Sequence, residues 1–288
     1  MDASTQVDLF DHDLPDGWHQ GIFTQKISAA TKKRNTELRK KAAEHIHALE
    51  KGKKQDAENI TEQVNKACTQ LRTQIAKDAK AILADDKIPA LVGGDHSTPL
   101  GLIDALTEKH GAIGILQIDA HADLRAAYEG FTYSHASIMY NAIQNEQVSR
   151  LVQVGIRDLC DDEMDIIRSS DRRIITHFNH ELQEAKFRGI DWNSVCTQII
   201  SELPQKVYIS FDIDGLDPKL CPHTGTPVPG GLSFDEAVYL LRAVAESGRQ
   251  IVGFDLVEVT PAKDGWDAIV GARLLYKMCN LALKSNME

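Results

Sequence analysis

The stretch Ile115-Leu116-Gln117-Ile118-Asp119-Ala120-His121-Ala122-Asp123 is an apolar run followed by three potential metal ligands at intervals of two. Its apolar residues are typical of a strand that is covered on both faces. In an extended chain, residues i, i+2 and i+4 point the same way, so Asp119, His121 and Asp123 would converge beyond the end of the strand. Carboxylate and imidazole ligands together suit Mn, Zn, Fe or Ni better than Ca or Mg. Taken alone, this stretch is explained equally well by a polar loop after a strand.

Strands and helices alternate along the chain from residue 87 onward. Short apolar runs between turn signals predict the strands, and apolar residues at helical intervals predict the helices. This alternation is typical of βα units, which form a mainly parallel sheet with helices on both faces. We therefore predict an α/β fold with three layers, helix, sheet and helix. The predicted strands are 88–92, 113–118, 151–156, 173–176, 206–211 and 250–257, and the main predicted helices are 99–109, 135–145, 191–202, 233–248 and 266–284.

The chain shows no linker and no internal repeat, so we predict one domain, 1–288. Its three parts are an irregular opening segment, 1–30, a helical segment, 31–86, and a catalytic α/β core, 87–288. An antiparallel pair of helices is expected in the second part, with a break at Lys51-Gly52-Lys53-Lys54 because glycine is a weak helix former. His45 and His47 are two residues apart and share no helix face, so we interpret both as surface histidines.

The composition restricts the partners of the protein. The formal net charge is −10 over 288 residues and the pI is about 5.6, which argues against nucleic acid or an anionic membrane as a partner. The same charge would tolerate a small cationic ligand. The five cysteines are an odd number without a CxxC pair, which is typical of free thiols in a reducing cytoplasm. The polar start of the chain and the lack of a long apolar run predict neither a signal peptide nor a membrane span, hence a cytoplasmic protein.

Polar side chains gather where the predicted strands end. In open α/β sheets, sites form beyond the carboxyl ends of the strands. So many carboxylates in one place repel one another unless cations compensate their charge. Two divalent metal ions would provide that compensation and would activate a bridging water near neutral pH. The residues that follow strand ends are His96, Asp119, His121, Asp123, Asp212, Asp214 and Glu258.

Five motifs in this order resemble the ureohydrolase family, which comprises arginases, agmatinases and their relatives. The resemblance spans roughly residues 88–284 and implies the three-layer fold that arginases share with deacetylases. Deacetylases of this fold use one zinc ion, and the additional carboxylates here argue against that chemistry. The motifs are Gly-Gly-Asp-His (93–96), Asp-Ala-His-Ala-Asp (119–123), Ser-Phe-Asp-Ile-Asp-Gly-Leu-Asp-Pro (210–218), Thr-Gly-Thr-Pro (224–227) and Val-Glu-Val-Thr-Pro (257–261).

The resemblance also implies two Mn²⁺ ions per subunit, with a hydroxide between them that attacks the guanidinium carbon of the substrate. A tetrahedral intermediate then collapses to urea and an amine. Asp119 and Asp212 are expected to bridge the two ions. The implied ligands are His96, Asp119, Asp123 and Asp212 for one ion, and His121, Asp119, Asp212 and Asp214 for the other.

Three residues receive catalytic roles from the same resemblance. Asp214 is expected to hold the hydroxide and to pass its proton to the leaving nitrogen. Glu258 is expected to face the guanidinium, whose planar donor fork pairs well with a carboxylate. His135 matches the histidine that family members use as a proton shuttle, and the ordinary pKa of histidine, near neutral pH, suits that role.

The expected substrate is inferred from positions at which this sequence differs from arginases. The stretch from Asp123 to Ser137 is most similar to prokaryotic agmatinases, which cleave agmatine to putrescine and urea. Arginases carry an Asn at the position of Arg125 and an Asp at the position of Cys160. Both departures argue against arginine. An arginase, or a hydrolase of another guanidino or formimino compound, remains the alternative within enzymes.

A third hypothesis is a metal-binding but catalytically silent subunit. Residues 1–30 contain no convincing counterpart of the strand and Gly/Arg-rich loop with which the family opens, which predicts a truncated form or a missing edge strand. Intact His135, Asp214 and Glu258 argue against the silent subunit. The resemblance further implies a homo-oligomer, trimer or hexamer, and a place in polyamine metabolism.

Overall fold

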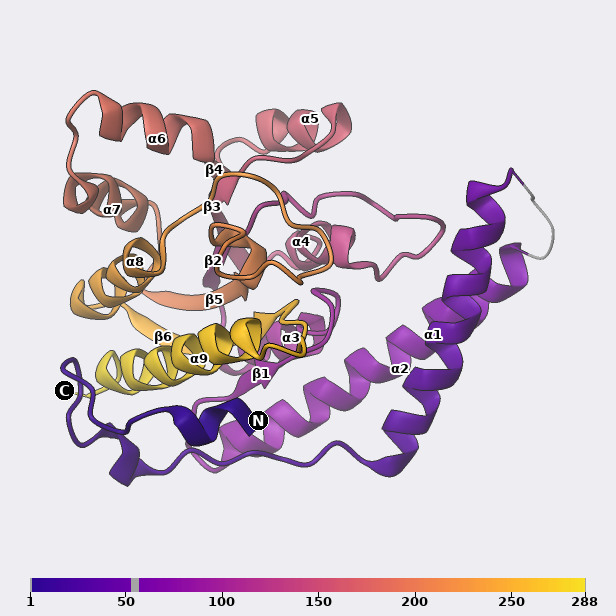
Figure 1. Ribbon diagram of the computed structural model, residues 1–288, viewed down its shortest axis with the longest axis horizontal. Helices are drawn as coiled ribbons and strands as arrows, with labels where there is room; N and C mark the ends of the chain where they lie inside the picture. The colour runs from indigo at the N-terminus through magenta and orange to yellow at the C-terminus, as the bar shows by residue number, and fades with distance from the viewer. Residues whose placement is uncertain (1, 53–56, 288) are drawn as a thin grey trace.

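The computed structural model describes residues 2–52 and 57–287. Within these residues, six strands form one parallel sheet in the order β1-β6-β5-β2-β3-β4 (Figure 1). The predicted α/β class is confirmed. The strands are β1 (Ala90–Val92), β2 (Ile113–Ile118), β3 (Val148–Ile156), β4 (Ile174–Phe178), β5 (Lys206–Asp212) and β6 (Gln250–Val257).

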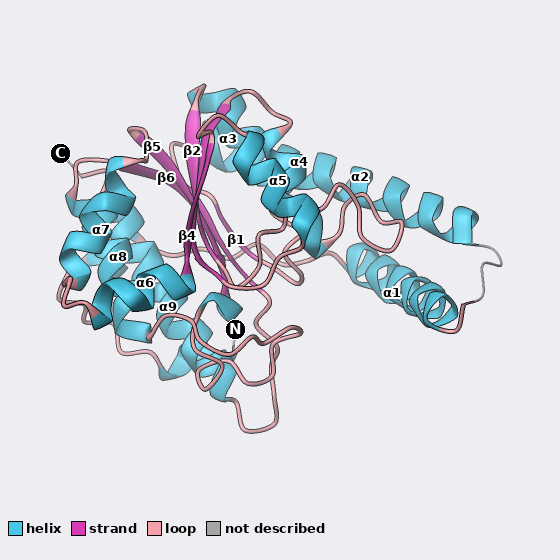
Figure 2. Cartoon of the chain, turned by 90° about the horizontal axis from the view of Figure 1, so that it is seen from above, coloured by secondary structure: helices cyan, strands magenta, loops and turns pink. Residues whose placement is uncertain are grey.

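Helices cover both faces of the sheet, so the predicted three-layer arrangement is also confirmed (Figure 2). One apolar core joins the sheet to α6–α9, and a second core joins it to α2 (Ala57–Ala84), α3 and α4. The predicted helix 135–145 is shorter than expected, because a 3-10 turn, His135–Ser137, precedes α4. The helices are α3 (Leu100–His110), α4 (Ile138–Ile143), α5 (Asp161–Ser169), α6 (Asn179–Phe187), α7 (Trp192–Ser201), α8 (Phe234–Glu246) and α9 (Trp266–Lys284).

The register of the sheet aligns the carboxyl ends of four strands. Val92 of β1 pairs with Leu256 of β6, Leu256 with Phe211 of β5, and Phe211 with Ile118 of β2. These apolar residues are buried except Val92, which lies on the edge strand. The residues that follow this row therefore emerge side by side at one edge of the sheet, where α/β proteins form their sites.

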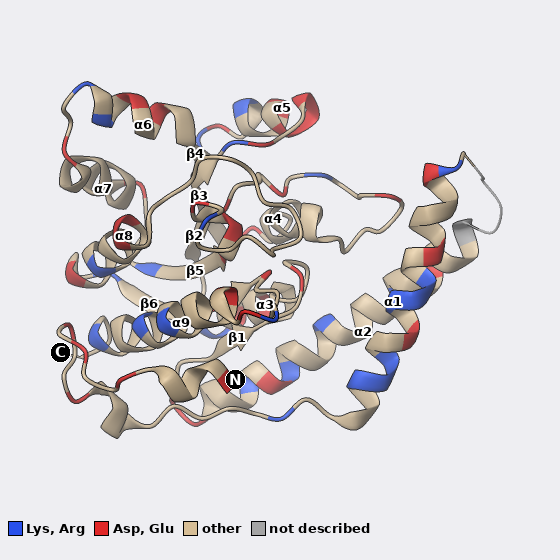
Figure 3. Cartoon of the chain, viewed as in Figure 1, with Lys and Arg blue, Asp and Glu red and all other residues tan. Residues whose placement is uncertain are grey.

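A helical hairpin projects from the body of the molecule. It consists of α1 (Ala29–Glu50) and α2 (Ala57–Ala84), as the sequence predicted for 31–86 (Figure 2). Lys51 and Gly52 form a turn after α1, whereas Lys53 and Lys54 lie outside the described residues. One flank of α2 packs on α3, where the Arg72 guanidinium donates two hydrogen bonds to Asp104, of 2.6 and 2.9 Å. Lysine and arginine residues recur along the hairpin (Figure 3).

The interpretation of His45 as a surface residue was wrong. Its side chain is buried, its Nε2 lies 3.0 Å from the carbonyl oxygen of Glu129, and its ring meets the edge of Phe131. His47, by contrast, is exposed and pairs with Glu50 on the hairpin surface, as the sequence predicted. His45 thus joins α1 to the loop that follows β2, a contact between residues 84 positions apart.

The opening segment, residues 2–28, contains two 3-10 helices, Asp2–Gln6 and Gly17–Gln20, and no strand. Asp13 anchors it to the body through Arg242 Nε at 2.6 Å and Lys277 Nζ at 2.9 Å. Among the described strands, β1 consequently forms one edge of the sheet. No described helix is long and apolar enough to cross a membrane.

Candidate metal centre and active site

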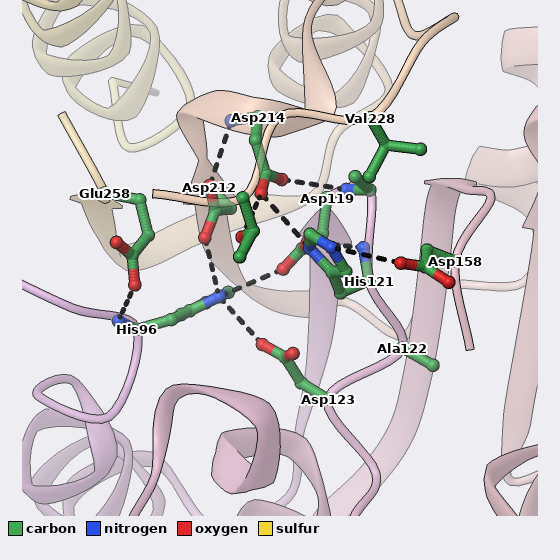
Figure 4. Close-up of polar contacts among 12 residues, drawn as sticks. His96, Asp119, His121, Ala122, Asp123, Asp158, Asp212, Asp214, Val228 and Glu258 are labelled. Atoms are coloured by element: carbon green, nitrogen blue, oxygen red, sulfur yellow. Dashed lines mark hydrogen bonds and ion pairs between the residues drawn. The ribbon is translucent and has the colours of Figure 1, made fainter. Parts of the chain in front are cut away.

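The predicted ligands follow three aligned strand ends and meet in one cluster (Figure 4). Asp119 directly follows β2, Asp212 is the last residue of β5, and His96 lies four residues beyond β1. The two strand-end aspartates are fixed in the same way. Oδ1 of Asp119 accepts the backbone N–H of His121 at 2.7 Å, and Oδ1 of Asp212 accepts that of Asp214 at 2.9 Å. Each aspartate therefore turns the chain as it leaves the sheet, and its Oδ2 faces His96 Nδ1.

Four residues form what we call the His96 cluster: His96, Asp119, Asp123 and Asp212. Nδ1 of His96 lies 3.0 Å from Asp119 Oδ2, 3.0 Å from Asp123 Oδ2 and 3.3 Å from Asp212 Oδ2. On its other side, Nε2 of His96 bonds Ser210 Oγ at 2.8 Å, which fixes the orientation of the ring. All four residues are buried.

Nδ1 of His96 has no hydrogen-bond partner despite its three near carboxylates. The ligand atoms of His96, Asp119 and Asp123 all lie within 4.8 Å of one another, and Asp212 Oδ2 faces the same nitrogen. A buried imidazole nitrogen and three carboxylate oxygens in that arrangement match the donor set of a divalent transition metal. The His96 cluster therefore fits a metal ion.

Three residues form the His121 cluster: Asp119, His121 and Asp214. His121 Nδ1 lies 3.1 Å from Asp214 Oδ2 and 3.6 Å from Asp119 Oδ1. The ligand atoms of the three residues all lie within 4.8 Å of one another. Asp119 belongs to both clusters, one oxygen to each. The second cluster therefore fits a second metal ion, adjacent to the first.

The structure brings Asp119, His121 and Asp123 close together, but not through the extended chain that the sequence predicted. Residues 119–123 do not continue β2 as an extended chain. Asp123 has φ +55°, a left-handed conformation that is uncommon outside glycine. His121 instead turns toward Asp214, while Asp123 turns toward His96 (Figure 4). The three ligands therefore separate into two clusters around Asp119.

Glu258 lies next to the His96 cluster, also in a left-handed conformation with φ +60°. Its Oε1 accepts the backbone N–H of His96 at 2.9 Å, and its own N–H donates to Gly94 at 2.9 Å. Burial raises the pKa of Glu258 to about 7. Strained backbone at two site residues, Asp123 and Glu258, is typical of functional positions.

The charges in the two clusters perturb one another strongly. Burial raises the pKa of Asp212, and the neighbouring charges of Asp214 and Asp119 raise it further. Burial lowers the pKa of His121, but the carboxylates of Asp119 and Asp214 outweigh this effect and raise the pKa to about 11. A proton on His121 thus does what a bound cation would do, because it offsets carboxylate charge.

A pocket of about 150 Å³ opens beside the His121 cluster. His135 lies in its wall, 5.8 Å from the ring of Tyr128. Burial lowers the pKa of His135, so that its imidazole is neutral near pH 7. The residues that line the pocket are His121, Asp123, Arg125, Tyr128, His135, Ala136, Asp158, Leu159, Glu163 and Thr226.

Sequence reasoning assigned no role to three residues that the structure places around the site. Ser210 holds His96, Asp158 lies 3.8 Å from His121 Nε2, and Thr226 Oγ1 lies 3.4 Å from Asp214 Oδ2. Ser210 precedes Asp212 by two residues on one strand, so its inward orientation was a usable signal. Asp158 and Thr226 lie in loops, where no periodicity indicates the direction of a side chain.

Comparison with known proteins agrees with this fold. The solved structure of proclavaminate amidino hydrolase from Streptomyces clavuligerus superposes with a TM-score of 0.64 at 27% identity, over 75% of this chain and 71% of that chain. The agmatine ureohydrolase of Thermoplasma volcanium gives a TM-score of 0.64 at 27% identity, over 75% of this chain and 70% of that chain.

Sequence relatives point the same way. The chain is 36% identical to N(1)-aminopropylagmatine ureohydrolase of Thermus thermophilus over 207 residues, which are 72% of this chain and 67% of the relative. It is 32% identical to guanidinobutyrase of Pseudomonas aeruginosa over 215 residues, which are 71% of this chain and 63% of the relative. The chain thus spans about two thirds of the length of these relatives.

Fold, strand-end clusters and relatives together define an α/β protein of the ureohydrolase class. More specifically, the family model described as the arginase family matches residues 24–280. The chain belongs to the arginase family.

Proposed function

We propose that the protein hydrolyses a guanidino compound to urea and an amine with the help of two divalent metal ions. The observation that carries this proposal is the pair of clusters that share Asp119 beside a pocket. When bound, such ions supply Lewis-acid activation of a water molecule. Manganese is the proposed metal. The proposed ligands are His96, Asp119, Asp123 and Asp212 for one ion, and His121, Asp119, Asp212 and Asp214 for the other.

The contacts of Asp214 and Glu258 suit their proposed catalytic roles. Oδ1 of Asp214 accepts the N–H of Ala120 at 3.0 Å, which leaves Oδ2 directed at His121 to hold and transfer a proton. Oε1 of Glu258 is held by the N–H of His96, so Oε2 remains to accept a guanidinium N–H. Both carboxylates are thereby fixed before the substrate binds.

His135 is the proposed proton shuttle. Its place in the pocket wall puts it on the open side of the His121 cluster, where the leaving amine would depart. Because its imidazole is neutral near pH 7, it can take up a proton and deliver it to an amine or to water.

Agmatine is the substrate that we propose. Arg125, the cation of the pocket wall, is already engaged, since its Nε lies 3.6 Å from Glu163 Oε2 and its guanidinium lies over Tyr128. Asp158 presents a carboxylate that is 66% exposed at the same pocket. The wall therefore favours a cationic tail over a carboxylate tail. We further propose a cytoplasmic homo-oligomer, a trimer or hexamer, that acts in polyamine metabolism.

The test is urea release by the manganese-loaded protein from agmatine, arginine and 4-guanidinobutyrate in parallel. We expect turnover of agmatine only. Preferred turnover of guanidinobutyrate would show that Arg125 binds the substrate carboxylate and would contradict the tail assignment. Full metal occupancy without urea from any of the three compounds would support a catalytically silent subunit instead.

Asp158→Asn tests whether the Asp158 carboxylate binds the cationic tail of the substrate. We expect KM for agmatine to rise about tenfold with little change in kcat, because uniform binding is lost. Asp162→Asn on α5 is the matched control, since this exposed carboxylate does not line the pocket.

A further inference from the structure

The loop between β5 and α8 touches two of the proposed catalytic residues. This loop, residues 216–233, contains the Thr-Gly-Thr-Pro motif. Thr224 Oγ1 donates to the carbonyl oxygen of Glu258 at 2.9 Å, and Thr226 Oγ1 lies 3.4 Å from Asp214 Oδ2. Thr226 also lines the pocket. The position of this short segment therefore sets part of the pocket wall.

The first turn of α9 holds the loop immediately before these threonines. Asp267 is fully buried, and its two oxygens bind one residue, His223. Oδ1 accepts the backbone N–H of His223 at 3.0 Å, and Oδ2 lies 2.8 Å from its Nδ1. Since a buried carboxylate is costly unless it is paired, this contact is specific to one loop conformation. The adjacent Trp266 adds a second tie, from Nε1 to the carbonyl oxygen of Lys219 at 2.9 Å.

His223, Asp264 and Asp267 also lie within metal-ligand distance of one another. The contacts nevertheless describe a hydrogen-bonded pair. Both Asp267 oxygens are directed at His223, whereas Asp264 is exposed and accepts the N–H of Trp266, the first residue of α9, at 3.1 Å. Asp264 thus closes the turn that precedes α9.

We propose that Asp267 and His223 form a positioning pair that holds Thr224 and Thr226 against Glu258 and Asp214. The pair acts through the loop and touches neither substrate nor metal. Its kinetic consequence rests on the proposed function, whereas its effect on the loop does not. When His223 is protonated, its bond to Asp267 is charge-assisted and stronger than a neutral one.

The kinetic test compares Asp267→Ala and Asp267→Asn with Asp264→Asn as the matched control. Asp267→Ala is expected to lower kcat/KM for urea release about tenfold at unchanged metal content, because the threonines lose their fixed position. Asp267→Asn keeps an acceptor for the His223 N–H and is expected to recover part of the loss. Asp264→Asn should behave as wild type. A merely structural role would lower the melting temperature of Asp267→Ala but leave kcat/KM of the folded enzyme unchanged.

Hydrogen exchange provides a readout that does not depend on catalysis. The peptide 219–228 should exchange faster in Asp267→Ala than in wild type, even if the wild-type protein releases no urea. If Asp267→Ala does not fold, the exposed His223→Gln replaces it and should show a smaller change in the same peptide. Unchanged exchange in the folded variants would overturn the proposal. An equal loss of activity and of bound metal in Asp264→Asn would also overturn it, in favour of a metal site.

Discussion

The His96 and His121 clusters share Asp119 but differ in their access to solvent. His96 is 1% exposed and its ring is held from behind by Ser210. The His121 side chain is 23% exposed and opens to the pocket, and its Nε2 lies 3.8 Å from Asp158 Oδ2. Both clusters lie at the same edge of the sheet, so the difference arises from the loops that follow the strands.

This difference in solvent access indicates that the two proposed metal ions have different roles. The enclosed cluster is surrounded by fixed partners and is suited to hold its ion tightly. The open cluster faces the pocket and the proposed shuttle His135, so substrate and leaving group would meet the centre there. We therefore expect the ion of the His121 cluster to exchange first when metal is removed.

The largest expected effect is that of Asp119→Ala, because this substitution removes the residue that the His96 and His121 clusters share. Both ions should be lost, and urea release should fall by more than about a hundredfold. His121→Ala should lose only the ion of the open cluster. Asp212→Ala is expected to lose metal and activity together. Metal content per chain by mass spectrometry distinguishes these outcomes, and two retained ions in Asp119→Ala would contradict the shared ligand.

His135→Ala should have the next largest effect, and it tests the pocket side of the His121 cluster alone. Both ions are expected to remain, while kcat falls about a hundredfold because a general acid–base group is lost. Steady-state kinetics together with metal content measure this. Loss of either ion in His135→Ala would show that His135 is a ligand and that the shuttle role is wrong.

Ser210→Ala tests the enclosed His96 cluster. Removal of the Ser210 hydroxyl leaves Nε2 of His96 without its partner, so metal affinity at the His96 cluster should fall about tenfold. The His121 cluster should keep its affinity. Metal competition with a chelator resolves the two sites, and equal weakening of both would show that they are not independent.

The smallest expected effect concerns pH and the loop over the open cluster. The hydrogen bond to Asp267 raises the pKa of His223 above 6.5, and the charges of Asp267 and Asp264 act in the same direction. The stabilisation by this pair is therefore complete below the unfolded pKa and is lost as pH rises through the folded one. The difference in melting temperature between wild type and His223→Gln should be largest below pH 6.5 and shrink at higher pH. A difference that is independent of pH would contradict the charge on His223.

The sequence allowed prediction of the sheet and of the polar residues that gather at its edge, because both depend on local signals. Apolar runs such as 113–118 marked the strands, and the residues beyond them had to emerge at one edge. The orientation of Asp123 was not predictable, since it depends on a left-handed φ that the sequence does not encode locally. The burial of His45 was missed for a related reason: its partner Glu129 is remote in sequence. Loop residues such as Asp158 and Thr226 acquire their roles only through tertiary packing.

The central claim is that two metal ions bind around Asp119 and together enable urea release. The most direct measurement is a titration of the metal-free protein with Mn²⁺, in which bound metal and the rate of urea release from agmatine are followed together. We predict two ions per chain, with activity that appears as the second ion binds. Saturation at a single ion, or urea release that does not depend on metal, would contradict this account.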